Sequence, residues 1–225
     1  MKSDKTPRIG VTMRFSDTPN YVESRDAIAR DWGDFLSWSL PECIWMPIAN
    51  TGVSAAQMAA AWGVNGLVLT GGDDIGVDPA RDETEKALLE MAQQKDWPVF
   101  GVCRGLQLLC HVGGGQLTPC DEAEHVNTSH SIGFVQNVLG LGLKDVAISV
   151  NSYHSLGVRA QDVPPGFSVG AVADGAWAEC IVDEPGRRVA VMWHPERERP
   201  YAEIDRAIVR RLFLGVESGT DLAAR

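Results

Sequence analysis

The stretch PVFGVCRGLQLLCHVGGGQL, residues 98–117, passes from a strand-like apolar run directly into a helix-like one, with Cys103 at the corner. A sharp turn from a strand into a helix strains the backbone of the corner residue and projects its side chain clear of the sheet. Such a turn needs small neighbours, which Gly101 and Gly105 supply. The start of a helix also favours the thiolate form of a cysteine. The stretch therefore predicts a nucleophile elbow, although a buried cysteine that only fills a tight turn would give the same pattern.

Short β-branched runs alternate with helical patterns on the N-terminal side of this corner. Strands are predicted at 8–13, 43–48, 65–70 and 98–102, and helices at 24–40, 53–63 and 81–95. This alternation predicts an α/β fold with a mostly parallel sheet that is flanked by helices on both faces. After residue 130 the pattern changes to antiparallel hairpin strands at 145–150, 167–173, 178–183 and 188–193, followed by a last helix at 201–215.

Composition limits the classes of protein that fit. A formal net charge of -10 over 225 residues disfavours binding to a nucleic acid polymer. No apolar run approaches the roughly 20 residues that span a bilayer, so no membrane association is expected. The N-terminus lacks a secretory pattern, which favours a cytoplasmic location with reduced cysteines. We expect one domain over residues 1–225, with flexible ends at 1–7 and 216–225.

Two further motifs follow predicted strands, at the edge of the sheet where α/β proteins place reactive groups. The WHPE motif (193–196) presents His194 and Glu196 two residues apart. A thiolate nucleophile needs an imidazole base, and a carboxylate fixes the tautomer of that imidazole. The LTGGDDIGVDP stretch (69–79) follows a buried strand with two glycines, Gly71 and Gly72, whose backbone N–H groups are available to an oxyanion. Taken alone, the WHPE motif is equally compatible with a solvated turn after a strand.

Taken together, TGGDDI, RDETEKALLEMA, PVFGVCRGLQLL, GGGQL and MWHPE resemble the class I glutamine amidotransferase-like superfamily. The Arg after the cysteine and the RDxxE helix are similar to its γ-glutamyl hydrolase branch, peptidase family C26. Glutaminases that are linked to synthases more often resemble GxCLGxQ. The resemblance implies a flavodoxin-like central sheet and a Cys-His-Glu triad. It also implies hydrolysis of a γ-glutamyl amide through a glutamyl thioester, with release of glutamate.

The resemblance assigns roles to individual positions. It implies Cys103 as nucleophile, His194 as its base and Glu196 as the orienting carboxylate, with the backbone amides of Gly72 and Arg104 as oxyanion donors. It further implies that the glutamyl group is contacted by Gln107 and by the loop VNSYHSLGV (150–158), through Tyr153, His154 and Ser155.

The segment RFSDTPNYVESRDAIARDW (14–32) is a candidate for recognition of the leaving group. Arg14, Tyr21 and Arg25 cluster near the start of a predicted helix, and the pair Arg14 and Arg25 suits a phosphate. Helix capping and surface ion pairs explain the same charges. The segment resembles that of bacterial enzymes that remove glutamate from γ-glutamyl nucleotide amidates.

The sequence predicts no metal and no cofactor. His125 and His130 stand five residues apart, but no neighbouring Cys or carboxylate pattern completes a zinc ligand set.

Three functions remain open. The first is a freestanding hydrolase acting on a small γ-glutamyl substrate, such as a γ-glutamyl amine or nucleotide amidate. The second is a glutaminase subunit that delivers ammonia to a synthase partner. The third is a non-catalytic binding or stress-response module, which an intact triad disfavours.

Overall fold

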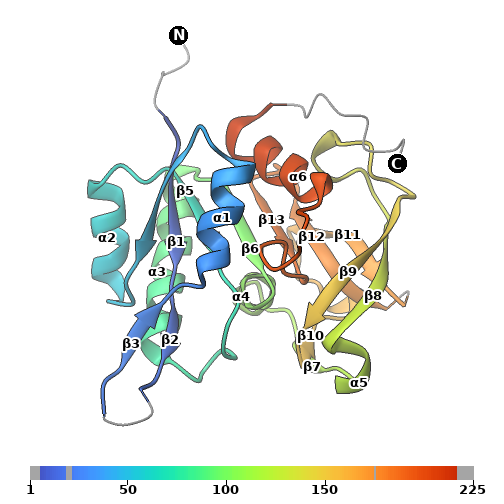
Figure 1. Cartoon of the computed structure of the whole chain (residues 1–225), viewed down its shortest axis with the longest axis horizontal. Helices are drawn as coiled ribbons and strands as arrows, with labels where there is room; N and C mark the ends of the chain where they lie inside the picture. The colour runs from blue at the N-terminus through green and yellow to red at the C-terminus, as the bar shows by residue number, and fades with distance from the viewer. Residues whose placement is uncertain (1–5, 19–21, 175, 217–225) are drawn as a thin grey trace.

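The fold is built on one nine-stranded mixed sheet, shown in Figure 1 as a computed structural model that describes residues 6–18, 22–174 and 176–216. The strands lie in the order β4-β1-β5-β6-β13-β12-β11-β8-β9. Their bounds are β1 (Arg8–Thr12), β4 (Ile44–Ile48), β5 (Gly66–Leu69), β6 (Val99–Val102), β8 (Val126–Phe134), β9 (Ala147–Tyr153), β11 (Phe167–Ala173), β12 (Trp177–Asp183) and β13 (Arg188–Val191).

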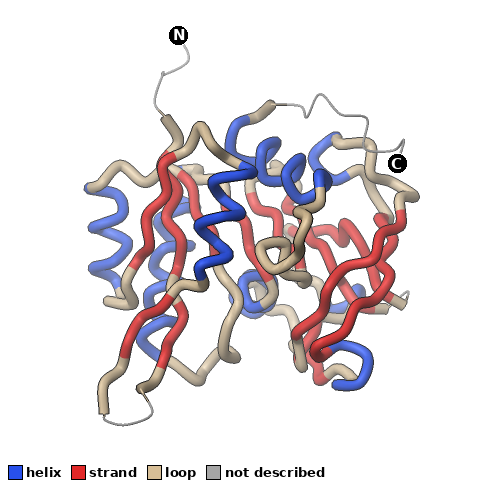
Figure 2. Tube along the Cα trace, viewed as in Figure 1, coloured by secondary structure: helices blue, strands red, loops and turns tan. Residues whose placement is uncertain are grey.

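The first five strands of that order are parallel and confirm the predicted flavodoxin-like arrangement. The helices on this half are α1 (Arg30–Ser39), α2 (Val53–Ala61), α3 (Pro79–Lys95), α4 (Arg104–Val112) and α6 (Glu203–Leu214). Right-handed crossovers place α1 and α6 on one face, where they contact each other, and α2, α3 and α4 on the other. Figure 2 shows these helices flanking the strands. The carboxyl ends of β5, β6 and β13 therefore meet at one edge.

The remaining strands are antiparallel and confirm the extra strands that were predicted in the C-terminal half. In the strand order β9 lies four places beyond β13. Nevertheless, the side chain of Asn151 on β9 is hydrogen-bonded to the backbone of His194, three residues after β13 ends. This half of the sheet therefore curls back on itself, so that its outermost strand reaches the edge where the parallel strands end.

Local sequence accounts for the clearest elements. Helix α3 begins with a good cap, because the side chain of Asp78 accepts a hydrogen bond from the N–H of Ala80 and Pro79 occupies the first turn. Strands β5 and β6 are buried along their whole length, as expected for strands that helices cover on both faces. The N-terminal half was predictable because its apolar runs have no polar face.

Three features differ from the sequence predictions. The expected helix at 24–40 starts only at Arg30, because residues Arg25–Ala27 form strand β3, which pairs antiparallel with β2 (Arg14–Ser16). Strand β8 was not predicted. The structure also contains a short pair of β7 (Thr118–Pro119) with β10 (Leu156–Gly157), and a short helix α5 (Glu122–His125). The predicted flexible ends fall largely on residues 1–5 and 217–225, and Tyr21 is likewise outside the described residues.

All five cysteines are free thiols. Among the described residues, no helix combines the length and the apolar character needed to cross a membrane.

Candidate active site

The sharp corner predicted at Cys103 is present between β6 and α4. The residue has φ 51° and ψ -100°, a strained conformation for a side chain with a Cβ, and its N–H donates to the carbonyl of Val191 at 2.8 Å. A Cβ at Gly105 would lie 2.6 Å from the carbonyl oxygen of Leu69, so only glycine allows α4 to approach β5 this closely. The residue Cys103 is 6% exposed, and it lies at the edge of the sheet where the parallel strands end.

His194 connects this cysteine to Glu196. Its Nδ1 lies 2.7 Å from Oε1 of Glu196, and both side chains are 2% exposed. Burial alone would lower the pKa of His194, but a hydrogen bond with Cys103, a hydrogen bond with Glu196 and the charges of both partners outweigh it and raise this pKa to about 9. The imidazole is therefore protonated at neutral pH. His194 is hydrogen-bonded to Glu196 and lies close enough to Cys103 for the sulfur to raise its pKa.

The backbone around His194 is held tightly. Asn151 accepts a hydrogen bond from the N–H of His194 at 2.8 Å and donates another to its carbonyl at 2.9 Å. On the other side, a Cβ at Gly71 would lie 2.5 Å from Cε1 of the imidazole. The ring therefore occupies the space that a side chain at position 71 would take, and the Gly-Gly turn has a steric role that its sequence did not reveal.

A buried ion network ties the elbow to helix α3. Glu85, which is fully buried, pairs with Arg81 at 3.1 Å and also with Arg104, and Arg104 pairs in addition with Asp82. Arg81 donates to the carbonyls of Thr70 and Gly71. The side chain of Arg104 thus points toward α3, while its backbone N–H belongs to the unpaired amides of the first turn of α4.

Gly72, the other expected oxyanion donor, has φ 141°. This backbone conformation favours glycine, and a Cβ there would lie 2.4 Å from Nη1 of Arg81. The oxyanion roles of Gly72 and Arg104 stay predictions.

The loop predicted to hold the glutamyl group divides into residues that border the site and one that does not. Gln107 donates through Nε2 to the carbonyl of Leu156 at 2.8 Å and so anchors the loop to α4. The ring of Tyr153 meets the ring of His194 edge-on, with centroids 5.6 Å apart. The carbonyl of Ser155 accepts from the N–H of Cys120 at 2.8 Å. His154 is 3% exposed and packs instead among His125, His130 and Glu179.

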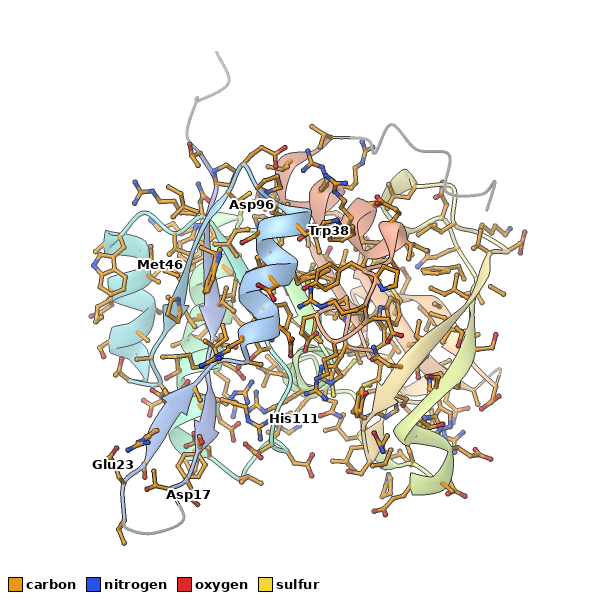
Figure 3. The ribbon with its side chains drawn as sticks, in the orientation of Figure 1. Asp17, Glu23, Trp38, Met46, Asp96 and His111 are labelled. Carbon is orange, nitrogen blue, oxygen red and sulfur yellow. The ribbon has the colours of Figure 1, made fainter. Side chains whose placement is uncertain are left out.

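The two arginines of the leaving-group segment lie on the β2–β3 hairpin. Figure 3 labels Asp17 and Glu23 on this hairpin, which projects from the body of the molecule. Arg14 pairs with Asp73 at 3.1 Å and lines a hollow of about 630 Å³. Its Cβ lies 3.2 Å from the position of a Cβ on Gly72, so the hollow borders the Gly-Gly turn. Arg25 pairs with Glu23.

The expectation of no metal near His125 and His130 rested on the absence of a local Cys or carboxylate pattern that completes a ligand set. The fold instead brings two distant residues, His154 and Glu179, to this pair. These four residues are separated by up to 54 positions, so no local spacing rule detects them.

Sequence reasoning also missed several residues that position the site. Asn151 carried no signal of its own, because it fell in the loop predicted at 150–158, whereas the structure places it on β9. Arg81 and Glu85 stand four positions apart, which is an ion-pair spacing on a helix, and the RDxxE pattern could have identified them. Asp205 accepts a hydrogen bond from Nε1 of Trp193 at 2.9 Å and is 4% exposed.

The sheet order, the strained cysteine corner and the imidazole that joins it to a carboxylate define a class I glutamine amidotransferase-like fold with a cysteine-centred site. The sequence model of the Peptidase C26 family matches residues 7–196, and the chain belongs to this family.

Curated relatives carry related names. The chain is 24% identical over 196 residues to the gamma-glutamyl-CDP-amidate hydrolase of Campylobacter jejuni, which covers 84% of this chain and 90% of that protein. It is 30% identical over 159 residues to a glutamine amidotransferase-like protein of Lactococcus lactis, covering 59% of this chain and 66% of that protein. A GMP synthase of Xanthomonas campestris is 30% identical over 139 residues, which are 61% of this chain and 26% of the synthase.

Solved structures support the fold. The chain superposes on a glutamine amidotransferase from Thermotoga maritima with a TM-score of 0.64 at 14% identity, covering 92% of this chain and 83% of that one. For the glutaminase domain of Trypanosoma brucei CTPS the TM-score is 0.65 at 16% identity, covering 93% of each chain.

Proposed function

We propose that this protein is a cysteine hydrolase that cleaves a γ-glutamyl amide and releases glutamate. The observation that carries the proposal is the strained corner at Cys103 beside His194, whose Nδ1 is hydrogen-bonded to Glu196, at the carboxyl ends of β6 and β13. A structural cysteine needs neither a strained corner nor an imidazole with an oriented tautomer. Membership in the Peptidase C26 family supports the same class of reaction.

The proposed reaction has two steps. The thiolate of Cys103 attacks the γ-carbonyl carbon, and the C–N bond breaks as the imidazolium of His194 gives its proton to the departing amine. The neutral imidazole then takes a proton from water, which attacks the glutamyl thioester. Glutamate leaves, and the proton that His194 has gained restores the starting ion pair. Glu196 keeps Nδ1–H in place throughout, because its Oε1 accepts that hydrogen.

Backbone amides are the proposed stabilisers of the tetrahedral oxyanion. The amide of Arg104 lies at the N-terminus of α4, and the amide of Gly72 lies in a turn that has no room for a side chain. Donors of this kind contribute about 3 to 4 kcal/mol each to the stability of the transition state. The buried pairs of Arg104 with Asp82 and Glu85 hold that part of the site rigid.

The leaving group is proposed to lie in the hollow beside Arg14. This hollow is placed between the ends of β1 and β5, where strand order reverses and where α/β sheets bind ligands. The guanidinium of Arg14 is 44% exposed as a side chain and suits a phosphate oxygen. The name of the Campylobacter relative, which matches 84% of this chain, supports a γ-glutamyl nucleotide amidate as substrate.

A panel of substrates tests this proposal. Purified protein is incubated with γ-glutamyl-CDP-amidate, γ-glutamyl-putrescine, γ-glutamyl-aminobutyrate and glutamine, and glutamate release is measured. Cys103→Ala should abolish release from every substrate. Arg14→Ala should lower kcat/KM for the nucleotide amidate by roughly 10-fold, the size expected for one phosphate contact, and Arg14→Lys should lower it less. Neither Arg14 variant should alter the cleavage of γ-glutamyl-putrescine or γ-glutamyl-aminobutyrate.

The matching GMP synthase regions support a second candidate, a glutaminase that supplies ammonia to a synthase. That function predicts weak cleavage of glutamine alone, a marked rise when a synthase is added, and no cleavage of the other three substrates. If wild type cleaves none of the four substrates, or if Cys103→Ala cleaves them equally well, the hydrolase proposal is wrong.

A further inference from the structure

Three imidazoles and one carboxylate meet inside the curl of the antiparallel strands, outside the proposed active site. His125 ends α5, His130 lies on β8, His154 follows β9 and Glu179 lies on β12. One ligand atom from each residue can be chosen so that all four lie within 4.8 Å of one another. Three of the side chains are at most 3% exposed, and the side chain of His130 is 12% exposed.

All but one of the side-chain nitrogen and oxygen atoms of this cluster lack hydrogen-bond partners. This holds for both ring nitrogens of His125 and of His130, for Nε2 of His154 and for both carboxylate oxygens of Glu179. A buried polar atom without a partner costs about 1 to 3 kcal/mol, so such atoms are rare and ask for an explanation. They lie together in one place, which indicates a missing common partner.

The tautomer of His154 shows what kind of partner is missing. Its Nδ1 lies 3.1 Å from the carbonyl oxygen of Leu156, and since a carbonyl only accepts, Nδ1 must carry the hydrogen. In the neutral ring Nε2 then presents a lone pair, and it lies 3.7 Å from Oε1 of Glu179. Two electron-rich atoms face each other, so a positive charge between them is required. A backbone acceptor on the outer nitrogen is also how proteins orient metal-binding histidines.

A single proton serves this cluster poorly. It can satisfy the approach of His130 Nε2 to Glu179 Oε1, which is 3.4 Å, but it leaves both nitrogens of His125 unpaired. A divalent cation accepts lone pairs from all four residues at once.

We infer that His125, His130, His154 and Glu179 form a four-coordinate site for a divalent transition ion of the Zn²⁺ type. Three imidazoles and a carboxylate suit such an ion, whereas Ca²⁺ and Mg²⁺ prefer oxygen ligands. Ligand atoms of a tetrahedral zinc site lie about 3.4 Å apart, so the widest pair must close by roughly 1 Å or slightly more. Four protein ligands, three of them buried, leave no position for a substrate, which makes the site structural.

The position of the site gives it a consequence for the active-site loop. The carbonyl of Leu156 receives the hydrogen bond of His154 and that of Gln107 on α4. Tyr153, next to His154, packs against the ring of His194. An ion bound to His154 would therefore fix the loop that borders the catalytic histidine.

Metal content tests the inference. The protein is produced without a polyhistidine tag, stripped with a chelator, reconstituted with Zn²⁺ or with Co²⁺, and freed of excess metal. We expect roughly one ion per chain and, with Co²⁺, the visible absorption of tetrahedral coordination. Zn²⁺ should also raise the melting temperature of the stripped protein. Glu179→Gln and His125→Asn should each lose most of the bound metal and the rise in melting temperature.

Two control variants separate this site from other metal-binding groups. His111→Ala removes the exposed histidine of α4, labelled in Figure 3, and should keep the ion. A cysteine beside a histidine can bind zinc on its own, so Cys103→Ala tests whether the ion binds there instead. We expect this variant to keep the ion as well. Metal that is lost in Cys103→Ala but kept in Glu179→Gln overturns the inference. So does wild-type protein that takes up neither ion and melts at the same temperature with and without Zn²⁺, a measurement that needs no variant to fold.

Discussion

Asn151 holds His194 from both sides of its peptide unit, accepting from the N–H at 2.8 Å and donating to the carbonyl at 2.9 Å. Asn151 lies on β9 and His194 follows β13, and these strands are four places apart in the sheet, so only the curl of the antiparallel half brings the two residues together. The direction of the imidazole therefore depends on a side chain from the outermost strand.

Replacing Asn151 with Asp should slow the reaction without abolishing substrate binding. Asp keeps the acceptor for the N–H of His194 but loses the donor for its carbonyl, and it places a negative charge beside Glu198, which is 2.9 Å from Nδ2 of Asn151. We expect kcat to fall by roughly 10- to 100-fold, as for other residues that orient a reactive histidine, with KM nearly unchanged. Steady-state kinetics on the best γ-glutamyl substrate provide the measurement. A rise in KM at constant kcat would show that Asn151 binds substrate instead.

Adding one methyl group at Gly71 should displace the imidazole. In Gly71→Ala the new Cβ would meet Cε1 of His194 at 2.5 Å, so the ring must rotate away from Cys103 or the turn must shift. We expect at least a 10²-fold loss of kcat, because a displacement of about 1 Å can cost that much. Gly133→Ala is a matched control, since nothing lies within 4 Å of a Cβ there. Equal activities of the two variants would rule out this steric role.

Loss of the charge at Glu85 should destabilise the protein. Glu85 forms ion pairs with two buried arginines, Arg81 and Arg104. In Glu85→Gln, Arg104 keeps its ion pair with Asp82, but Arg81 loses the carboxylate that it pairs with. Breaking one side of a buried pair costs about 3 to 5 kcal/mol in the free energy of unfolding. Urea denaturation measures it, and Glu90→Gln on the exposed side of α3 should change it by less than about 0.5 kcal/mol. A change of similar size in both variants would argue against the network.

Neutralising Asp205 should stabilise the protein in a pH-dependent way. Burial raises the pKa of Asp205 to about 7, although the hydrogen bond from Trp193 acts against this rise. The folded state therefore holds this proton more tightly than the unfolded state, and the resulting stability is full below about pH 4 and lost as the pH rises through about 7.

In Asp205→Asn the amide oxygen still accepts from Trp193, and the charge is gone. Its free energy of unfolding should exceed that of wild type at about pH 8, and the difference should shrink as the pH falls toward about 4. Asp17→Asn, on the exposed hairpin shown in Figure 3, is the control. A difference that does not vary with pH would refute the burial argument.

The parallel half of the fold was predictable because its strands are covered on both faces and show as short apolar runs. β8 was not, since its sequence VNTSHSIGF is polar at many positions, and one of these, His130, is turned into the curl. The helix expected from residue 24 failed for a different reason. Arg25–Ala27 pair with β2, and a pair of three-residue strands is too short to leave a periodic signal.

The cysteine corner and the WHPE motif were recognisable because the residues of each motif are neighbours in the sequence. The residues that hold these motifs in place were not recognisable, since they come from distant parts of the chain. Asn151 reaches His194 over 43 positions, and Glu179 joins histidines that lie 25 to 54 positions before it. Reactive residues that lie together in one short motif can be found from a single sequence, whereas contacts between distant residues are found only in the folded structure.

The curl gives the connection between β8 and β9, residues 135–146, an unexpected importance. Neighbouring side chains on a strand point to opposite faces, so a slip of one residue in the pairing of β9 with β8 would carry Asn151 to the far side of the sheet. Insertions and deletions in surface connections are usually harmless. In this protein, one that shifted the pairing would release the backbone of His194 without touching any residue near it.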